Sequence, residues 1–248
     1  MEIIAYTATL VTGMILGMMG GGGSVFALSI LVYLLRIQPL AATGYSLFIV
    51  GACCLVTGIM AYRRNETDPR PVIRFGTPAV PAVLLARQFL VPLIPPSKQW
   101  LIMLLLAAVM VCAAALVFFN VQPKQGEPKG MTVAGGGFLT GLLTGISGAG
   151  SGFIIVPVLT AAMGIPLKKA IGSSLLIIAV TAGIGFICAA RTMTINWQLL
   201  VPLTILALAG SLLGAAICNR INVSLLKQIL SVTMLLMALF IIVKTFFV

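Results

Sequence analysis

The sequence predicts an all-α integral membrane protein made of two repeats of four apolar segments, and three observations support this. Of the 248 residues, 60% are hydrophobic and 8% are charged, whereas an average soluble domain has about 25% charged residues. Polar residues divide the chain into segments of membrane-spanning length. The second half also repeats glycines and serines of the first at a constant offset. This composition excludes a soluble enzyme and a disordered chain.

The basic excess does not indicate a nucleic-acid partner. Fifteen Lys and Arg against four Asp and Glu give a net charge of +11, and the basic residues are scattered between hydrophobic runs, as in cytoplasmic loops of membrane proteins. The expected partner is instead the lipid bilayer. The five cysteines lie in apolar stretches without CxxC spacing and are expected to be buried. The start of the chain lacks the positive region of a cleaved signal peptide, so the first segment is expected to be retained.

The apolar segments follow one another with short polar interruptions. They cover residues 3–35, 40–62, 71–94, 99–121, 131–163, 170–190, 197–218 and 225–248, and a polar loop occupies residues 122–130. Six of them have the length of one crossing, which needs about 20 residues. The first and fifth are equal in length, and both are too long for one crossing and short for two.

A single offset, the one that carries Gly13 onto Gly141, aligns the two halves without a gap. The aligned pairs are Gly13–Gly141, Gly17–Gly145, Gly20–Gly148, Gly22–Gly150, Ala42–Ala170, Gly44–Gly172, Ser46–Ser174 and Leu47–Leu175. Such agreement at one offset indicates a duplication. We therefore expect a first transmembrane repeat at residues 1–121, a linker at 122–130 and a second repeat at 131–248.

The distribution of Lys and Arg distinguishes two topologies. If each long segment crosses once, the repeats are parallel and the two sides carry six and eight basic residues. If each long segment enters and returns, the sides carry ten and four. Because cytoplasmic loops are enriched in Lys and Arg, we favour the second arrangement. It places both termini outside and makes the repeats inverted relative to each other.

The glycine-rich stretches of the two long segments are candidate binding sites. Each glycine in a helix costs about 1 kcal/mol relative to alanine, and broken backbone is tolerated in a membrane only where it is buried in protein or lines a cavity. Free amides at helix N-termini attract anions, and paired interruptions in inverted repeats mark transporter sites. The candidate substrate-binding residues are Gly21, Gly22, Gly23, Ser24, Ala149, Gly150, Ser151 and Gly152.

Other interpretations apply to some of these residues. Ser24 and Ser151 are expected either to cap the following helix or to bind a ligand. The glycines upstream, spaced by three and four residues, are typical of close helix packing in membranes.

Ser46, Ser174 and Arg87 complete the candidate substrate-binding set. Ser46 and Ser174 either add hydroxyls to a polar pocket or bond to their own helix backbone. Arg87 is the one strongly charged residue well inside a span, and it either contacts substrate or snorkels to the helix end, about 10–12 Å away. Its counterpart at the offset is Ala215, so a cavity between the halves would hold a single cation.

The missing residue types limit the chemistry. The chain has no His, and its four acidic residues lie at the terminus or in polar loops. Without them, Ser/His/Asp or Cys/His catalysis and ordinary metal sites cannot be built, and there is no P-loop. We therefore expect no enzyme activity, no catalytic residue, no cofactor and no metal.

Several stretches together resemble the TauE/SafE family of sulfite exporters and anion permeases. The resemblance rests on residues 20–24, 141–152, 170–174 and 210–215 and covers nearly the whole chain. It implies transport of a small oxyanion or sulfonate across a prokaryotic plasma membrane or an organellar one. The first glycine run differs from the second, so the two half-sites need not contribute equally.

The residues and the resemblance together predict a multi-pass plasma-membrane protein. We expect a secondary transporter or facilitator that moves a small anion, such as a sulfur oxyanion or organosulfonate, by alternating access. An anion channel and a membrane subunit of a larger complex without transport activity of its own remain alternatives. A homo-oligomer is also compatible with the sequence.

Overall fold

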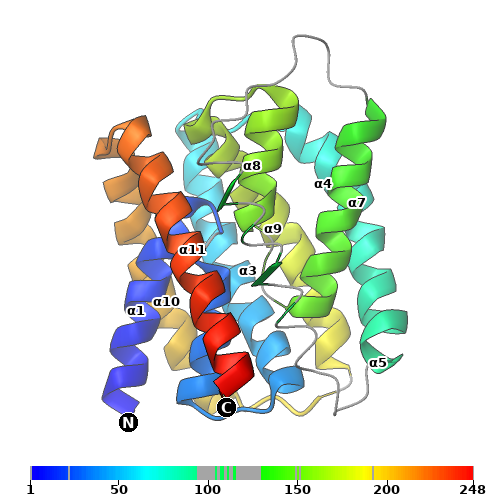
Figure 1. The fold of residues 1–248 in the computed structure, drawn as a ribbon, viewed down its shortest axis with the longest axis vertical. Coiled ribbons are helices and arrows are strands. Elements are labelled where there is room, and N and C mark those ends of the chain that lie inside the picture. The colour runs from blue at the N-terminus through cyan, green and yellow to red at the C-terminus, as the bar shows by residue number, and fades with distance from the viewer. Residues whose placement is uncertain are drawn as a thin grey trace.

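The protein is a bundle of helices lying roughly along one axis (Figure 1). The computed structural model describes residues 2–21, 23–93, 104, 107–108, 111, 114–115, 130–148, 150, 152–191 and 193–247. Among these residues the ordered elements are all helical. The predicted segment at 99–121 lies almost wholly outside the described residues. Gly22, Ala149 and Ser151 also lie outside them.

The elements of the first half are α1 (Glu2–Met19), α2 (Ser24–Ser29), the π-helical turn η1 (Ile30–Leu34), α3 (Pro39–Arg63), α4 (Pro69–Leu85), the π-helical turn η2 (Ala86–Leu90) and α5 (Val91–Leu93). Local sequence sets several of these starts. Prolines in the first turn of α3 and α4 fix φ at a helical value. Their missing N–H groups cost nothing, because the first N–H groups of a helix have no acceptor within it. The Asp68 side chain caps α4 by accepting from the Arg70 amide.

The second half contains α7 (Gly130–Ser147), α8 (Gly152–Met163), α9 (Leu167–Ala190), α10 (Trp197–Arg220) and α11 (Val223–Phe247). The helices α1, α2, α3 and α4 begin at residues 2, 24, 39 and 69, and α7, α8, α9 and α10 begin at 130, 152, 167 and 197. Each start is thus separated from its counterpart by the same offset that carries Gly13 onto Gly141 in the sequence.

Each long apolar segment forms two helices with a glycine turn between them. After α1 the chain turns back, so that Gly23 packs on Leu16, and Ala27 and Leu31 line one small void with Thr12 and Thr9 of α1. In the second half α8 returns along α7, and a methyl group at Gly136 would meet Val158. The interruptions therefore fall where glycine is concentrated.

The central helices are α3 and α9, which run antiparallel. Gly58 lies against Leu176, Gly51 against Ala182, and Gly185 against Leu47. About two thirds of the apolar window of α3 (67%) and 56% of that of α9 are buried, against 28% for α4–α5 and 33% for α10. The outer helices therefore present apolar side chains to the surroundings.

Each interrupted segment packs on an outer helix of the other half. A methyl group at Gly13 would collide with the Ala207 carbonyl oxygen of α10, and one at Gly141 would collide with the Ala79 carbonyl oxygen of α4. Only glycine allows backbones to approach so closely. The upstream glycines are therefore sites of close helix packing, as their spacing in the sequence predicts.

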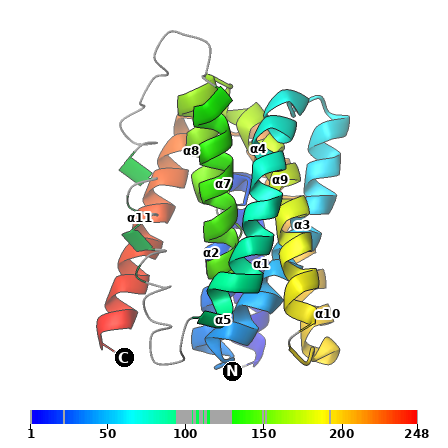
Figure 2. The ribbon, with the colours of Figure 1, turned by 90° about the vertical axis from the view of Figure 1, so that its right-hand side faces the viewer.

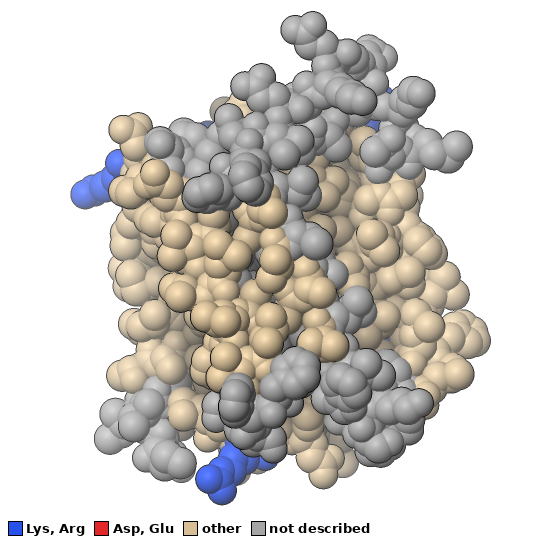
Figure 3. All heavy atoms as spheres, in the orientation of Figure 1, with Lys and Arg blue, Asp and Glu red and all other residues tan. Residues whose placement is uncertain are grey.

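Four of the described helices are long and apolar enough to cross a membrane. They are α3, α4–α5 (Pro69–Leu93), α9 and most of α10 (Trp197–Cys218). Figure 3 shows a broad band without charged side chains among the described residues of the visible face, with Lys and Arg near its two ends. Both chain ends lie at the same end of the bundle in two perpendicular views (Figures 1 and 2).

We predict that Gly13→Ala destabilises the protein, whereas Gly183→Ala does not. A methyl group at Gly13 collides with the α10 backbone, but one at Gly183 meets nothing within 4 Å. Overpacking costs about 1–3 kcal/mol, which lowers the unfolding midpoint by roughly 2–12 °C for a chain of this size. Thermal unfolding of both purified variants in detergent measures the difference. Equal midpoints would contradict the packing described for α1 and α10.

Candidate functional site

The two glycine interruptions meet inside the bundle, although they lie in opposite halves of the sequence. A methyl group at Gly152 would collide with the Gly20 carbonyl oxygen and would lie 2.6 Å from the Gly21 Cα. The Ser24 hydroxyl donates a hydrogen bond to the Gly150 carbonyl oxygen, and both residues are buried. The predicted residues Gly21, Ser24, Gly150 and Gly152 thus form one cluster, named here the break contact.

Glycine is required where α1 and α7 end. Gly20 and Gly148 have φ values of 61° and 65°, in the left-handed region that side chains other than glycine rarely adopt. The Gly148 amide donates to the Thr144 carbonyl oxygen, which ends α7. Neither glycine belongs to the predicted site, although their equivalence is visible in the sequence as an aligned pair.

The hydroxyl of Ser174 lies beside the break contact and bonds to the residue before it. Its Oγ donates to the Gly20 carbonyl oxygen at 2.8 Å and lies 2.7 Å from the Ile171 carbonyl oxygen of its own helix. The Ser174 hydroxyl therefore contacts the backbone of its own helix and also that of the first half. The bond to its own helix, one of the two expectations for this serine, does not keep it out of the centre. α9 is thereby attached to the end of α1.

Ser24 does not cap α2, contrary to one of the two expectations. Gly23 is the N-cap and makes no side-chain cap bond, while Ser24 is the first helical residue. A capping side chain must belong to the residue before the helix, so the Ser24 hydroxyl reaches across to Gly150 instead. Gly23 itself packs on Leu16, away from the second interruption.

Arg87 is buried, with 9% of its surface exposed. Its Nη2 donates to the Thr43 hydroxyl at 3.1 Å, and its Nε has no partner among the described residues. The guanidinium is therefore held in the interior and does not snorkel to the helix end. Arg87 lies in η2, and π-helical turns inside helices occur frequently at functional sites.

Both halves contribute to the surroundings of Arg87, but its sequence counterpart lies elsewhere. Its counterpart Ala215 packs on Gly17, since a methyl group there would lie 3.0 Å from the Ala215 amide nitrogen. Arg87 instead bonds to Thr43 of its own half, and Gly148 packs directly on Thr43. Arg87 and its counterpart Ala215 therefore lie in different surroundings, and the cavity with a single cation stays a prediction.

Ser46 is fully buried, and its hydroxyl has no hydrogen-bond partner among the described residues. It lies one helical turn after Thr43 on α3, so both hydroxyls are on the same face. Thr43 is not in the predicted substrate-binding set. Its spacing of three from Ser46 is the signal in the sequence that could have added it.

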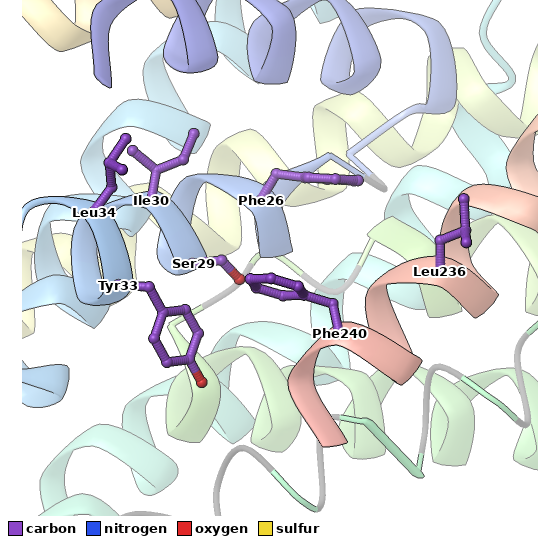
Figure 4. Close-up of a pocket in the computed structure, with 7 residues that line it drawn as sticks. All are labelled: Phe26, Ser29, Ile30, Tyr33, Leu34, Leu236 and Phe240. Carbon is purple, nitrogen blue, oxygen red and sulfur yellow. The ribbon is translucent and has the colours of Figure 1, made fainter. Parts of the chain in front are cut away.

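A separate hollow lies between α2–η1 and α11 (Figure 4). It has a volume of about 530 Å³ and is lined by Phe26, Ser29, Ile30, Tyr33, Leu34, Leu236 and Phe240. None of these described lining residues is cationic, so this part of the lining does not suit a small anion. Among the described residues, no three His, Cys, Asp or Glu side chains gather closely enough to hold a metal ion.

Comparisons with known proteins agree with this architecture. Residues 5–241 match the family model described as "Sulfite exporter TauE/SafE". A "Probable membrane transporter protein" of Xylella fastidiosa is 26% identical over 93% of this chain and 90% of its own length. Proteins also described as probable membrane transporters, from Methanocaldococcus jannaschii and Haemophilus influenzae, are 30% and 29% identical over 42% and 65% of the chain, covering 41% and 63% of their own lengths. No solved structure matches.

We predict that Ser24→Cys and Gly150→Cys together form a disulfide in a background lacking the native cysteines. A Cβ at Gly150 would lie 3.7 Å from the Ser24 Cβ, and disulfides join Cβ atoms about 3.5–4.5 Å apart. Mild oxidation followed by mass spectrometry detects the bond, with the two single variants as controls. If the double variant keeps two free thiols under oxidation, the break contact is absent.

Proposed function

The chain belongs to the TauE/SafE sulfite exporter family, and on that premise we propose that it moves a small anion across the plasma membrane by alternating access. The proposed substrate is a sulfur oxyanion or an organosulfonate, with sulfite as the first probe. The proposed role is that of a secondary transporter or facilitator. The names of its relatives describe membrane transporters, which supports transport rather than catalysis.

The break contact is the observation that carries this proposal. Two interrupted helices, one from each half, place non-helical backbone in the interior of a membrane protein. Such backbone is costly in hydrocarbon and marks substrate sites in transporters. The proposed site comprises Gly21, Gly22, Gly23, Ser24, Ala149, Gly150, Ser151 and Gly152, with Ser46, Ser174 and Arg87 beside them. In the described conformation the breaks touch, so substrate enters between them only when they separate.

We further propose that the two halves are inverted repeats. The support is the common offset of helix starts and the antiparallel packing of the equivalent helices α3 and α9. Comparable hydrogen bonds also occur at the two loops, because the Asp68 amide donates to Ser173 and the Asn196 amide donates to Tyr45, both at 2.9 Å. In this arrangement, rocking one half against the other opens the site to alternate sides.

The end with the α3–α4 loop is proposed to be cytoplasmic. This loop lies against the start of α9, where Glu66 contacts Gly172. At this end of the bundle, the described helix ends and loops carry the basic residues Arg63, Arg64, Arg70, Arg74, Lys168, Lys169 and Arg220. At the opposite end they carry Arg36 and Arg191. The positive-inside rule then sets the orientation.

Among the described residues, two serine hydrogen bonds join the halves at the centre. The Ser24–Gly150 bond links the two interruptions and the Ser174–Gly20 bond links α9 to the first, and each contributes roughly 0.5–1.5 kcal/mol. A bound oxyanion replaces them by accepting hydrogen bonds from the serines and the backbone amides. Binding therefore offsets the cost of separation, which couples substrate to opening.

We predict saturable sulfite flux in proteoliposomes that contain only this chain. An inside-negative potential contributes about 2.3 kcal/mol per charge for each 100 mV, which corresponds to roughly 50-fold outward accumulation of a monoanion at equilibrium. Uptake of labelled sulfite with and without an imposed potential measures this. Flux that does not saturate would indicate a channel. Absence of flux of any sulfur anion would contradict the proposal and favour a subunit that needs a partner.

We predict that Gly150→Leu abolishes transport without preventing membrane insertion. A side chain at Gly150 would collide with Ile178 and Val50, at 2.9 and 3.0 Å from its Cβ, and would displace Ser24. Gly183→Leu is the matched control, since a Cβ there meets nothing within 4 Å. Membrane yield and gel filtration establish folding, and sulfite uptake gives activity. Wild-type uptake by a folded Gly150→Leu variant would remove the break contact from the mechanism.

A further inference from the structure

The polar groups of the two halves are distributed unequally around the break contact. The Ser174 hydroxyl is bonded to Gly20, while the equivalent hydroxyl of Ser46 is fully buried and has no partner among the described residues. Arg87 and Thr43 of the first half correspond to Ala215 and Ile171 of the second. The buried side-chain donors without a partner among the described residues, Ser46 Oγ and Arg87 Nε, therefore both belong to the first half. The helices of the two halves nevertheless begin at equivalent positions.

Thr43 holds the Arg87 guanidinium in place. The Thr43 hydroxyl donates its proton to the Leu40 carbonyl oxygen at 2.8 Å and accepts from Arg87 Nη2 at 3.1 Å. Because the hydroxyl proton is already used, the direction of the second bond is fixed. Thr43 is thus a positioning residue, and the Arg87 Nε–H has no partner in the described part of the chain.

No carboxylate in the described part of the chain neutralises Arg87. The acidic side chains described there, Glu66 and Asp68, lie in the loop between α3 and α4. The C-terminal end of α7 lies close, since Gly148 contacts Thr43 and Gly145 faces Ala86. Its carbonyl dipoles favour a cation nearby, but they do not supply a full counter-charge. Burying an unpaired charge or donor is costly, so this arrangement calls for an anion.

We propose that Arg87 and Ser46 bind the substrate on the first-half side of the break contact and select a monoanion over a dianion. This inference rests on the proposed transport function and assigns its specificity. The guanidinium and the Ser46 hydroxyl donate to the oxygens of one –SO3⁻ group. Ser24 and Ser174 bond to backbone carbonyl oxygens in the described conformation and become further donors to the anion when the breaks separate.

Preference for a monoanion follows from the number of charges. A single buried guanidinium compensates one negative charge, and a second would stay unpaired away from water. A sulfonate carries one charge spread over three oxygens, which suits the donor geometry of arginine. Sulfate carries two charges at similar size and should be rejected.

Binding of methanesulfonate and sulfate to the purified full chain tests the proposal, using thermal stabilisation at matched ionic strength. We expect wild type to bind methanesulfonate at least about tenfold more tightly than sulfate. Arg87→Gln should weaken methanesulfonate binding on the order of 100-fold, because it removes the buried charge that pairs with the anion. Ser46→Ala should weaken it several-fold. Arg191→Gln, an exposed arginine at the end of the bundle, is the control.

Each outcome bears on a separate claim. Equal affinity for the two anions in wild type would overturn the selectivity without any variant, and so would unchanged methanesulfonate binding by a folded Arg87→Gln protein. If Arg87→Gln fails to fold, Arg87→Lys and Ser46→Ala decide, because wild-type affinity in both would overturn the site. In those cases saturable sulfite uptake by wild type would leave the proposed transport function intact. Absence of both binding and uptake in wild type would overturn the two together.

Discussion

Backbone polar groups cannot remain unpaired in the interior of a membrane protein, and this requirement governs the centre of the molecule. Each unsatisfied group costs several kcal/mol where no water can reach it. Serine hydroxyls meet part of this requirement: Ser24, next to the first interruption, donates to the Gly150 carbonyl oxygen, and Ser174 of α9 donates to the Gly20 carbonyl oxygen. Each half therefore supplies a hydroxyl donor to the interruption of the other half.

Close helix packing fixes the positions of the interruptions. Gly13 and Gly141 let each interrupted segment lie directly on the backbone of an outer helix from the other half. The central helices α3 and α9 are locked by small residues at Gly51 and Ala182. The interrupted segment of each half therefore packs on an outer helix of the other half, and the break contact lies where the two interrupted segments meet.

Within this matched framework the chemistry is one-sided. The two halves share the spacing of their helix starts and their glycine turns, but among the described residues only the first half carries a buried arginine with a threonine to orient it. A framework that two halves stabilise together can tolerate an uncompensated charge in one of them. In the proposed function, substrate selection therefore rests on residues other than the glycines that pack the helices.

The sequence alone determined the membrane class, the constant offset between the halves, the glycine interruptions and Arg87 as an exceptional charge. Composition, spacing and repetition are local or periodic properties, so they can be read from the chain. Tertiary structure decided the partners. It showed that Ser24 bonds to Gly150 rather than capping α2, that Ser174 is bonded while Ser46 has no partner among the described residues, and that Arg87 turns to Thr43 rather than to Ala215. These outcomes depend on which helices touch, and the crossing of the two halves sets those contacts through packing that no segment encodes by itself.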